Sequence, residues 1–117
     1  MRIRLCDHAL IINERINHMN LLFLGDVVGG HGCSFVRSKM PSIKREHNID
    51  MIIINGENSA TGNGITPSSA QELFDMGADV ITTGNHCFRR KEIMPYYDKW
   101  DNLLRPANFP EGNAGKG

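Results

Sequence analysis

The sequence predicts an α/β fold, a mostly parallel βαβαβ sheet. Short apolar runs alternate with longer amphipathic stretches from residue 19 to residue 104. The first three apolar runs each lead into a glycine and then a polar side chain, as is typical of buried parallel strands that end in a loop. These glycines, Gly25, Gly56 and Gly84, recur at a spacing of about 30 residues, close to one strand plus one helix.

The predicted strands are residues 21–24, 51–54 and 79–82, with a short fourth strand at 103–104. A helix is predicted over residues 33–48, with Pro41 either kinking it or opening a second helix. Thr66 and Pro67 are typical of a helix start, and Gly77 of its end. Residues 91–100 are predicted to be helical with a break near Pro95.

The composition excludes several classes of protein. In the 117 residues, 13 Lys and Arg balance 13 Asp and Glu, which disfavours bulk nucleic-acid binding and a polybasic membrane-surface protein. No apolar run approaches the ~20 residues of a membrane-spanning helix. The three cysteines, an odd number without CxxC spacing, are Cys6, Cys33 and Cys87. A disulfide framework is therefore not expected, and we expect a cytoplasmic location.

The first 18 residues are expected to be an upstream extension rather than part of the domain. Met19 and Asn20 lead directly into the first apolar run, which favours Met19 as the natural start. The alternative is an additional N-terminal strand or helix. The predicted domain is therefore residues 19–117.

Side chains capable of metal binding follow each of the first three strands. Asp26 follows the first strand, Glu57 and Asn58 the second, and Asn85 and His86 the third. Because the carboxyl ends of parallel strands meet at one edge of a sheet, we expect these side chains to converge. Two carboxylates, two carboxamides and an imidazole suit Mn, Fe or Zn. The alternative is that they are ordinary turn residues.

Other polar segments give weaker signals. The glycine-rich segment 25–32 follows a strand, but it lacks GK[ST], and Phe35 stands where GxGxxG requires its third glycine. A nucleotide-binding domain is therefore disfavoured, and we expect a flexible loop whose amides touch phosphate, with His31 nearby. Arg105 and Asn108 are candidate substrate-binding residues, with a role in the turn as the alternative.

With Gly25-Asp26, Asn55-Gly56-Glu57-Asn58, Gly84-Asn85-His86 and the segment 105–110 in this order, the chain resembles calcineurin-like metallophosphoesterases. Within them it resembles the YmdB-like branch of 2′,3′-cyclic-nucleotide phosphodiesterases. The resemblance implies the N-terminal half of an αββα sandwich. It also implies a metal-dependent phosphodiesterase that cleaves cyclic nucleotides or similar small phosphodiesters by two-metal hydroxide attack.

The resemblance also implies residue roles. Asp26 and Asn58 would bind one of two divalent metal ions (Fe or Mn, with Zn as a further option) and Asn85 the other. Glu57 would bridge the two ions, and His86 would donate the proton to the leaving group.

The family's later loops supply three histidine ligands that have no counterpart in these 117 residues. The second sheet would be missing with them, which predicts an exposed apolar sheet face and self-association through it. The alternative function is a truncated, non-catalytic fragment or interaction module.

Overall fold

The computed structural model describes residues 19–117; the predicted extension at residues 1–18 lies outside the described residues. Within 19–117, β1 (Leu21–Leu24), β2 (Met51–Asn55), β3 (Val80–Thr82) and β4 (Leu103–Leu104) form one sheet in the order β1-β2-β3-β4. Every neighbouring pair of strands is parallel. The predicted α/β class and parallel sheet are confirmed.

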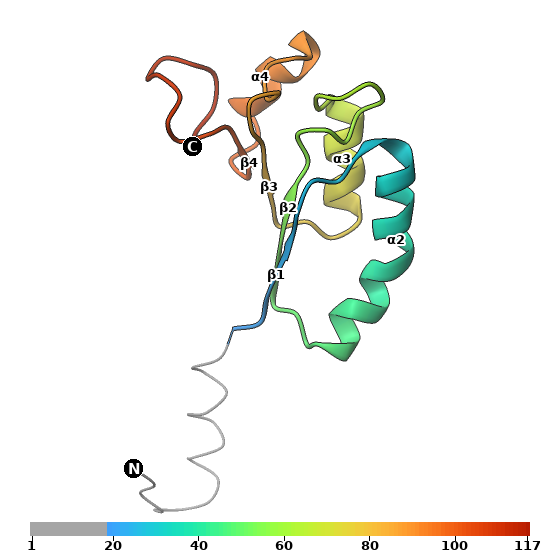
Figure 1. Ribbon diagram of the computed structural model, residues 1–117. Helices are drawn as coiled ribbons and strands as arrows, with labels where there is room; N and C mark the ends of the chain where they lie inside the picture. The colour runs from blue at the N-terminus through green and yellow to red at the C-terminus, as the bar shows by residue number, and fades with distance from the viewer. Residues whose placement is uncertain (1–18) are drawn as a thin grey trace, which may run out of the picture.

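Two helices connect the first three strands. Helix α2 (Gly29–Glu46) joins β1 to β2, and α3 (Pro67–Asp75) joins β2 to β3. Both lie on the same side of the sheet (Figure 1). A 3₁₀ turn, η1 (Lys91–Ile93), then leads into α4 (Met94–Tyr97) before β4. The helical stretch predicted over residues 91–100 thus begins where expected, but it ends at Tyr97.

The start of α2 corrects the prediction, because Gly29–Gly32 forms the first helical turn and not a flexible loop. Two contacts stabilise these poor helix formers in helical geometry. The Gly29 N–H donates to the Asn58 carbonyl oxygen at 2.9 Å, and Gly32 packs against buried Val27. Pro41 lies inside α2 and begins no second helix.

Helix α3 forms as predicted. The Thr66 side chain accepts a hydrogen bond from the Ser69 N–H at 3.1 Å, and the Ser69 hydroxyl accepts one from the Thr66 N–H at 3.0 Å. This reciprocal capping box satisfies two amides at the helix start. Pro67 occupies the first turn, and Gly77, with φ +107°, follows the helix end.

The core fills the space between the sheet and the two helices. Alternate strand residues point towards the helices, as the period of two in β2 requires. The most deeply buried core side chains, from the strands and from α2 and α3, are Ile52, Ile54, Ile81, Leu103, Cys33, Met40, Ala70 and Leu73.

The opposite face of β1 and β2 is apolar and open. Phe23 is 58% exposed and Leu21 51% exposed, and in the strand register Phe23 lies beside Ile53 and Leu21 beside Met51. The predicted exposure of an apolar sheet face is therefore confirmed. Among the described residues, no helix has the length and apolar character needed to cross a membrane.

Candidate functional site

The loops that carry the predicted site residues begin at the same level of the sheet. Backbone pairing continues past the strand ends: the Val27 N–H donates to the Asn55 carbonyl oxygen at 3.1 Å, and the Gly56 N–H donates to the Thr82 carbonyl oxygen at 3.0 Å. This pairing aligns the residues that follow β1, β2 and β3 at the carboxyl edge of the sheet. It is the position at which parallel sheets present their sites.

Asn58 is the centre of the cluster. Its Nδ2 donates to Oδ1 of Asp26 at 2.9 Å and lies 3.5 Å from Oε1 of Glu57. Its Oδ1 lies 2.9 Å from Nδ1 of His86. Because carboxylates only accept hydrogen bonds, Nδ2 must face Asp26 and Glu57, and Oδ1 must face the imidazole. The His86 ring therefore donates from Nδ1, which leaves Nε2 available to another partner.

The Glu57 side chain occupies space that is free only because residue 84 is a glycine. Its side chain is 14% exposed, and its Oε1 lies 3.6 Å from Nδ1 of His86. A Cβ at Gly84 would lie 1.6 Å from Oε2 of Glu57. The close approach expected of a glycine at this strand end is therefore real at Gly84.

The other two strand-end glycines differ. A Cβ at Gly56 would lie 2.5 Å from Cδ1 of Leu73, so glycine is required there by the core. At Gly25 a Cβ would meet nothing within 4 Å. The steric reason for glycine that the pattern suggested is thus absent at the end of β1.

Four of the five predicted site residues form one connected cluster, and Asn85 does not. Asn85 is exposed on the turn between Gly84 and His86. Within residues 19–117, no hydrogen bond joins its side chain to the other four. The structure places Asn85 beside the cluster in sequence, and its predicted contact with a metal stays a prediction.

The oxygen donors of the cluster are of the type that divalent cations accept. Carboxylate oxygens of Asp26 and Glu57 and a carboxamide oxygen of Asn58 are the hard donors that Mn and Fe accept. The missing Cβ of Gly84 leaves room for the Glu57 carboxylate. In the described part of the chain, no three His, Cys, Asp or Glu side chains group closely enough to hold a metal.

A second layer supports the turn that contains His86. The buried Tyr97 hydroxyl lies 3.1 Å from Oγ1 of Thr83 and 3.2 Å from the Cys87 carbonyl oxygen. The Thr83 hydroxyl donates to the Leu104 carbonyl oxygen of β4 at 2.6 Å. Burial is the main reason that the pKa of Tyr97 lies well above its usual value. Burial likewise raises the pKa of the Cys87 thiol, to which the nearby Glu57 charge adds.

The two weaker candidates lie on the loop after β4. Nη1 of Arg105 donates to the Pro106 carbonyl oxygen at 3.0 Å, so it stabilises the turn. Its Nε is buried and has no hydrogen-bond partner among residues 19–117. Asn108 is exposed. The turn role is therefore seen for Arg105, and contact of either residue with a substrate stays a prediction.

The glycine-rich start of α2 lines a cavity of about 570 Å³ with His31, Ser34 and the loop residues Thr61 and Gly62. None of the five predicted site residues lines this cavity. Contact of these amides or of His31 with a phosphate stays a prediction.

Sequence reasoning missed Arg90. Its Nε donates to the Asn63 carbonyl oxygen at 3.0 Å and its Nη2 to the Thr61 carbonyl oxygen at 2.5 Å. Arg90 therefore links the loop after β3 to the loop after β2. The only local signal is the run Gly62-Asn63-Gly64, which indicates an unusual backbone but does not identify its partner.

Comparison with known proteins agrees with this fold. A crystal structure of a phosphatase from Mycoplasma pneumoniae superposes with a TM-score of 0.79 at 30% identity, over 86% of this chain and 37% of that one. A hypothetical protein from Thermus thermophilus gives a TM-score of 0.77 at 36% identity, over 85% of this chain and 38% of that one. The fold is thus one found in phosphoesterases.

Sequence comparison is more specific. The model of the YmdB-like protein family matches residues 22–117. A relative from Bacillus subtilis, named 2′,3′-cyclic-nucleotide 2′-phosphodiesterase, is 48% identical over 99 residues, or 85% of this chain and 38% of that protein. The chain belongs to the YmdB-like protein family. It spans little more than a third of the length of the relatives it matches.

Proposed function

We propose that the protein takes part in metal-dependent hydrolysis of small phosphodiesters such as cyclic nucleotides. The observation that supports this most directly is the cluster of Asp26, Glu57, Asn58 and His86, joined by contacts of 2.9–3.6 Å at the carboxyl edge of the sheet. The names of the Bacillus relative and of the Mycoplasma structure are consistent with a phosphoesterase.

The proposed ligands are Asp26, Glu57, Asn58 and Asn85, which together would hold two divalent cations. When bound, such cations lower the pKa of a water molecule and neutralise charge on phosphate oxygens. The chain's own residues supply the rest. Glu57 and Asp26 provide negative charge that attracts the cations, and Asn58 orients both carboxylates through Nδ2.

His86 is the proposed proton donor to the leaving alkoxide. Its Nδ1 contacts Asn58 and Glu57, so the ring is held from one side, and the proton it would donate is the second one, carried on Nε2 in the imidazolium form. The side chain is 28% exposed, which leaves a path for a substrate to reach it.

We propose a reducing cytoplasm as the place of action. The support is that Cys33 and Cys87, the cysteines within the described residues, are both buried and unpaired.

The exposed apolar face of β1 favours a second candidate, a non-catalytic module that associates through this surface. The two candidates differ in their dependence on metal. Association through Leu21 and Phe23 needs no metal, whereas phosphodiester cleavage does.

The test is the metal content of the purified 117-residue chain by inductively coupled plasma mass spectrometry, together with hydrolysis of 2′,3′-cyclic AMP in added Mn²⁺. Metal binding that is lost in Glu57→Gln, with or without turnover, supports the proposed ligands. Turnover that depends on Mn²⁺ supports the reaction as well. A chain that binds no metal and cleaves nothing would reject the catalytic proposal for this chain and leave the association module.

A further inference from the structure

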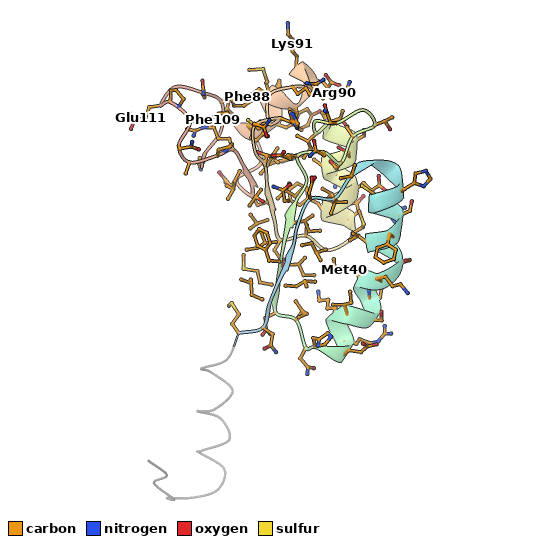
Figure 2. The ribbon with its side chains drawn as sticks, in the orientation of Figure 1. Met40, Phe88, Arg90, Lys91, Phe109 and Glu111 are labelled. Carbon is orange, nitrogen blue, oxygen red and sulfur yellow. The ribbon has the colours of Figure 1, made fainter. Side chains whose placement is uncertain are left out.

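We propose that Arg90 is a positioning residue for the cluster: by joining two loops, its guanidinium fixes the distance between Asn58 and His86. The proposal deepens the proposed function and depends on it for its catalytic meaning. Arg90 lies at the same end of the molecule as Phe88 and Phe109, beside the loop after β2 (Figure 2). It lies four residues after His86 in the chain.

The Arg90 side chain forms two hydrogen bonds to one loop, and these two bonds form a clamp. Nε donates to the Asn63 carbonyl oxygen at 3.0 Å and Nη2 to the Thr61 carbonyl oxygen at 2.5 Å. These acceptors are two residues apart on one loop, so a single planar fork grips both. Lysine has one nitrogen at the end of a flexible stem and cannot reproduce this geometry.

The loop needs an external partner because its backbone is unusual. Gly62, Asn63 and Gly64 have φ angles of +73°, +68° and +81°, three consecutive left-handed residues. Within the loop, the Ala60 N–H donates to the Gly64 carbonyl oxygen at 3.0 Å. In the described part of the chain, no backbone N–H reaches the carbonyl oxygens of Thr61 and Asn63. Arg90 is therefore their hydrogen-bond partner.

The stem of Arg90 also packs against this loop. A Cβ at Gly64 would lie 2.9 Å from Cγ of Arg90, so glycine is needed for the side chain to pass. The loop that Arg90 grips begins directly after Asn58 and Ser59. On the other side, the Arg89 N–H donates to the His86 carbonyl oxygen at 3.0 Å, which ties the residues before Arg90 to the His86 turn. Loss of the clamp should thus allow Asn58 and His86 to separate.

The experiment uses Arg90→Gln and Arg90→Lys in the full 117-residue chain, with Arg89→Gln as the matched control that removes a neighbouring exposed charge. Three quantities are measured: hydrogen exchange of the Ala60 amide, the NMR shifts of the Asn58 side-chain amide, and the Mn²⁺ dissociation constant. In both Arg90 variants we expect Ala60 to exchange about tenfold faster and the Asn58 signals to move. We also expect Mn²⁺ to bind about tenfold more weakly. Arg89→Gln should change none of the three.

Each outcome decides a separate question. Faster exchange at Ala60 with unchanged Asn58 signals would show that Arg90 only stabilises its loop, and it would overturn the proposal. Unchanged exchange in Arg90→Lys would overturn it as well. If the unmodified chain binds no Mn²⁺, the proposed metal chemistry is wrong. The positioning role is then tested by the NMR signals of Asn58 alone. Should Arg90→Gln not fold, Arg90→Lys, which keeps the charge and most of the stem, provides the same readouts.

Discussion

Nδ1 of His86 lies 2.9 Å from Oδ1 of Asn58, and this contact connects the loop after β3 to the loop after β2. The carboxamide is fixed from its other end by Asp26 and Glu57, so its oxygen has one orientation. Nδ1 of the imidazole then carries a proton, and Nε2 carries one as well only in the imidazolium form that proton donation requires. A carboxamide thus performs here the orienting task for which a carboxylate is often used, without adding a further negative charge.

Replacing Glu57 with Gln should remove metal binding. The substitution keeps the shape of the side chain but deletes the charge proposed to bind the two cations. Changes in residues that only support ligands cost about 10- to 100-fold in affinity, so a ligand should cost at least about 100-fold. Calorimetric titration with Mn²⁺ measures this. Glu92→Gln, at an exposed position, is the control, and equal binding by both variants would reject Glu57 as a ligand.

Replacing His86 with Ala should lower turnover even at Mn²⁺ concentrations high enough to keep the metal content nearly the same. A general acid contributes about 10²- to 10⁴-fold to the rate, and the imidazole is proposed to act on the leaving group only. Mass spectrometry of bound metal and the rate of 2′,3′-cyclic AMP cleavage are compared with those of His47→Ala, an exposed control. Loss of metal from His86→Ala would instead make His86 a ligand.

Replacing Gly84 with Ala should displace Glu57. The new Cβ would lie 1.6 Å from Oε2 of Glu57, a distance that no carboxylate can tolerate. We expect metal binding to weaken about as much as in Glu57→Gln, because the displaced carboxylate no longer reaches the site. Gly25→Ala is the matched control, since nothing lies within 4 Å of its added Cβ. Equal Mn²⁺ affinity in the two variants would contradict the geometry.

The chain should become less stable as the pH rises above about 9, the ordinary thiol pKa. Burial raises the pKa of both Cys33 and Cys87 above their reference value of 9.0, and it raises that of Tyr97 as well. At pH values above 9 the unfolded chain loses these thiol protons first, which favours unfolding. Urea unfolding at pH 8 and pH 10 tests this. A free energy of unfolding that is equal or higher at pH 10 would contradict it.

Replacing Phe23 with Asn should reduce binding of a hydrophobic dye. Phe23 is 58% exposed on the open face of β1, beside Leu21 and Ile53, whereas Phe35 is 65% exposed on α2. If the open sheet face binds the dye, Phe23→Asn lowers the fluorescence at least about twofold and Phe35→Asn leaves it nearly unchanged. Equal effects would indicate that scattered exposed side chains bind the dye.

The sequence predicted the strands, α3 and the meeting of Asp26, Glu57, Asn58 and His86, because these depend on local pattern and on the geometry of parallel sheets. It did not predict that α2 starts at Gly29, since glycine disfavours helix and the stabilising contact is with Asn58, 29 residues away. The clamp by Arg90 was not predictable for the same reason. Its carbonyl partners lie 27 and 29 residues earlier in the chain.

Within residues 19–117, the order β1-β2-β3-β4 means that each strand after β1 pairs with the strand made just before it. A nascent chain leaving the ribosome could therefore add each strand–helix unit to a sheet that already exists, without waiting for a later segment to be inserted between earlier strands. The residues of the cluster leave the ribosome in the same order: Asp26 first, Glu57 and Asn58 next, and His86 last. These four side chains would thus come together only when the third strand has docked, and no earlier product of translation would contain all four.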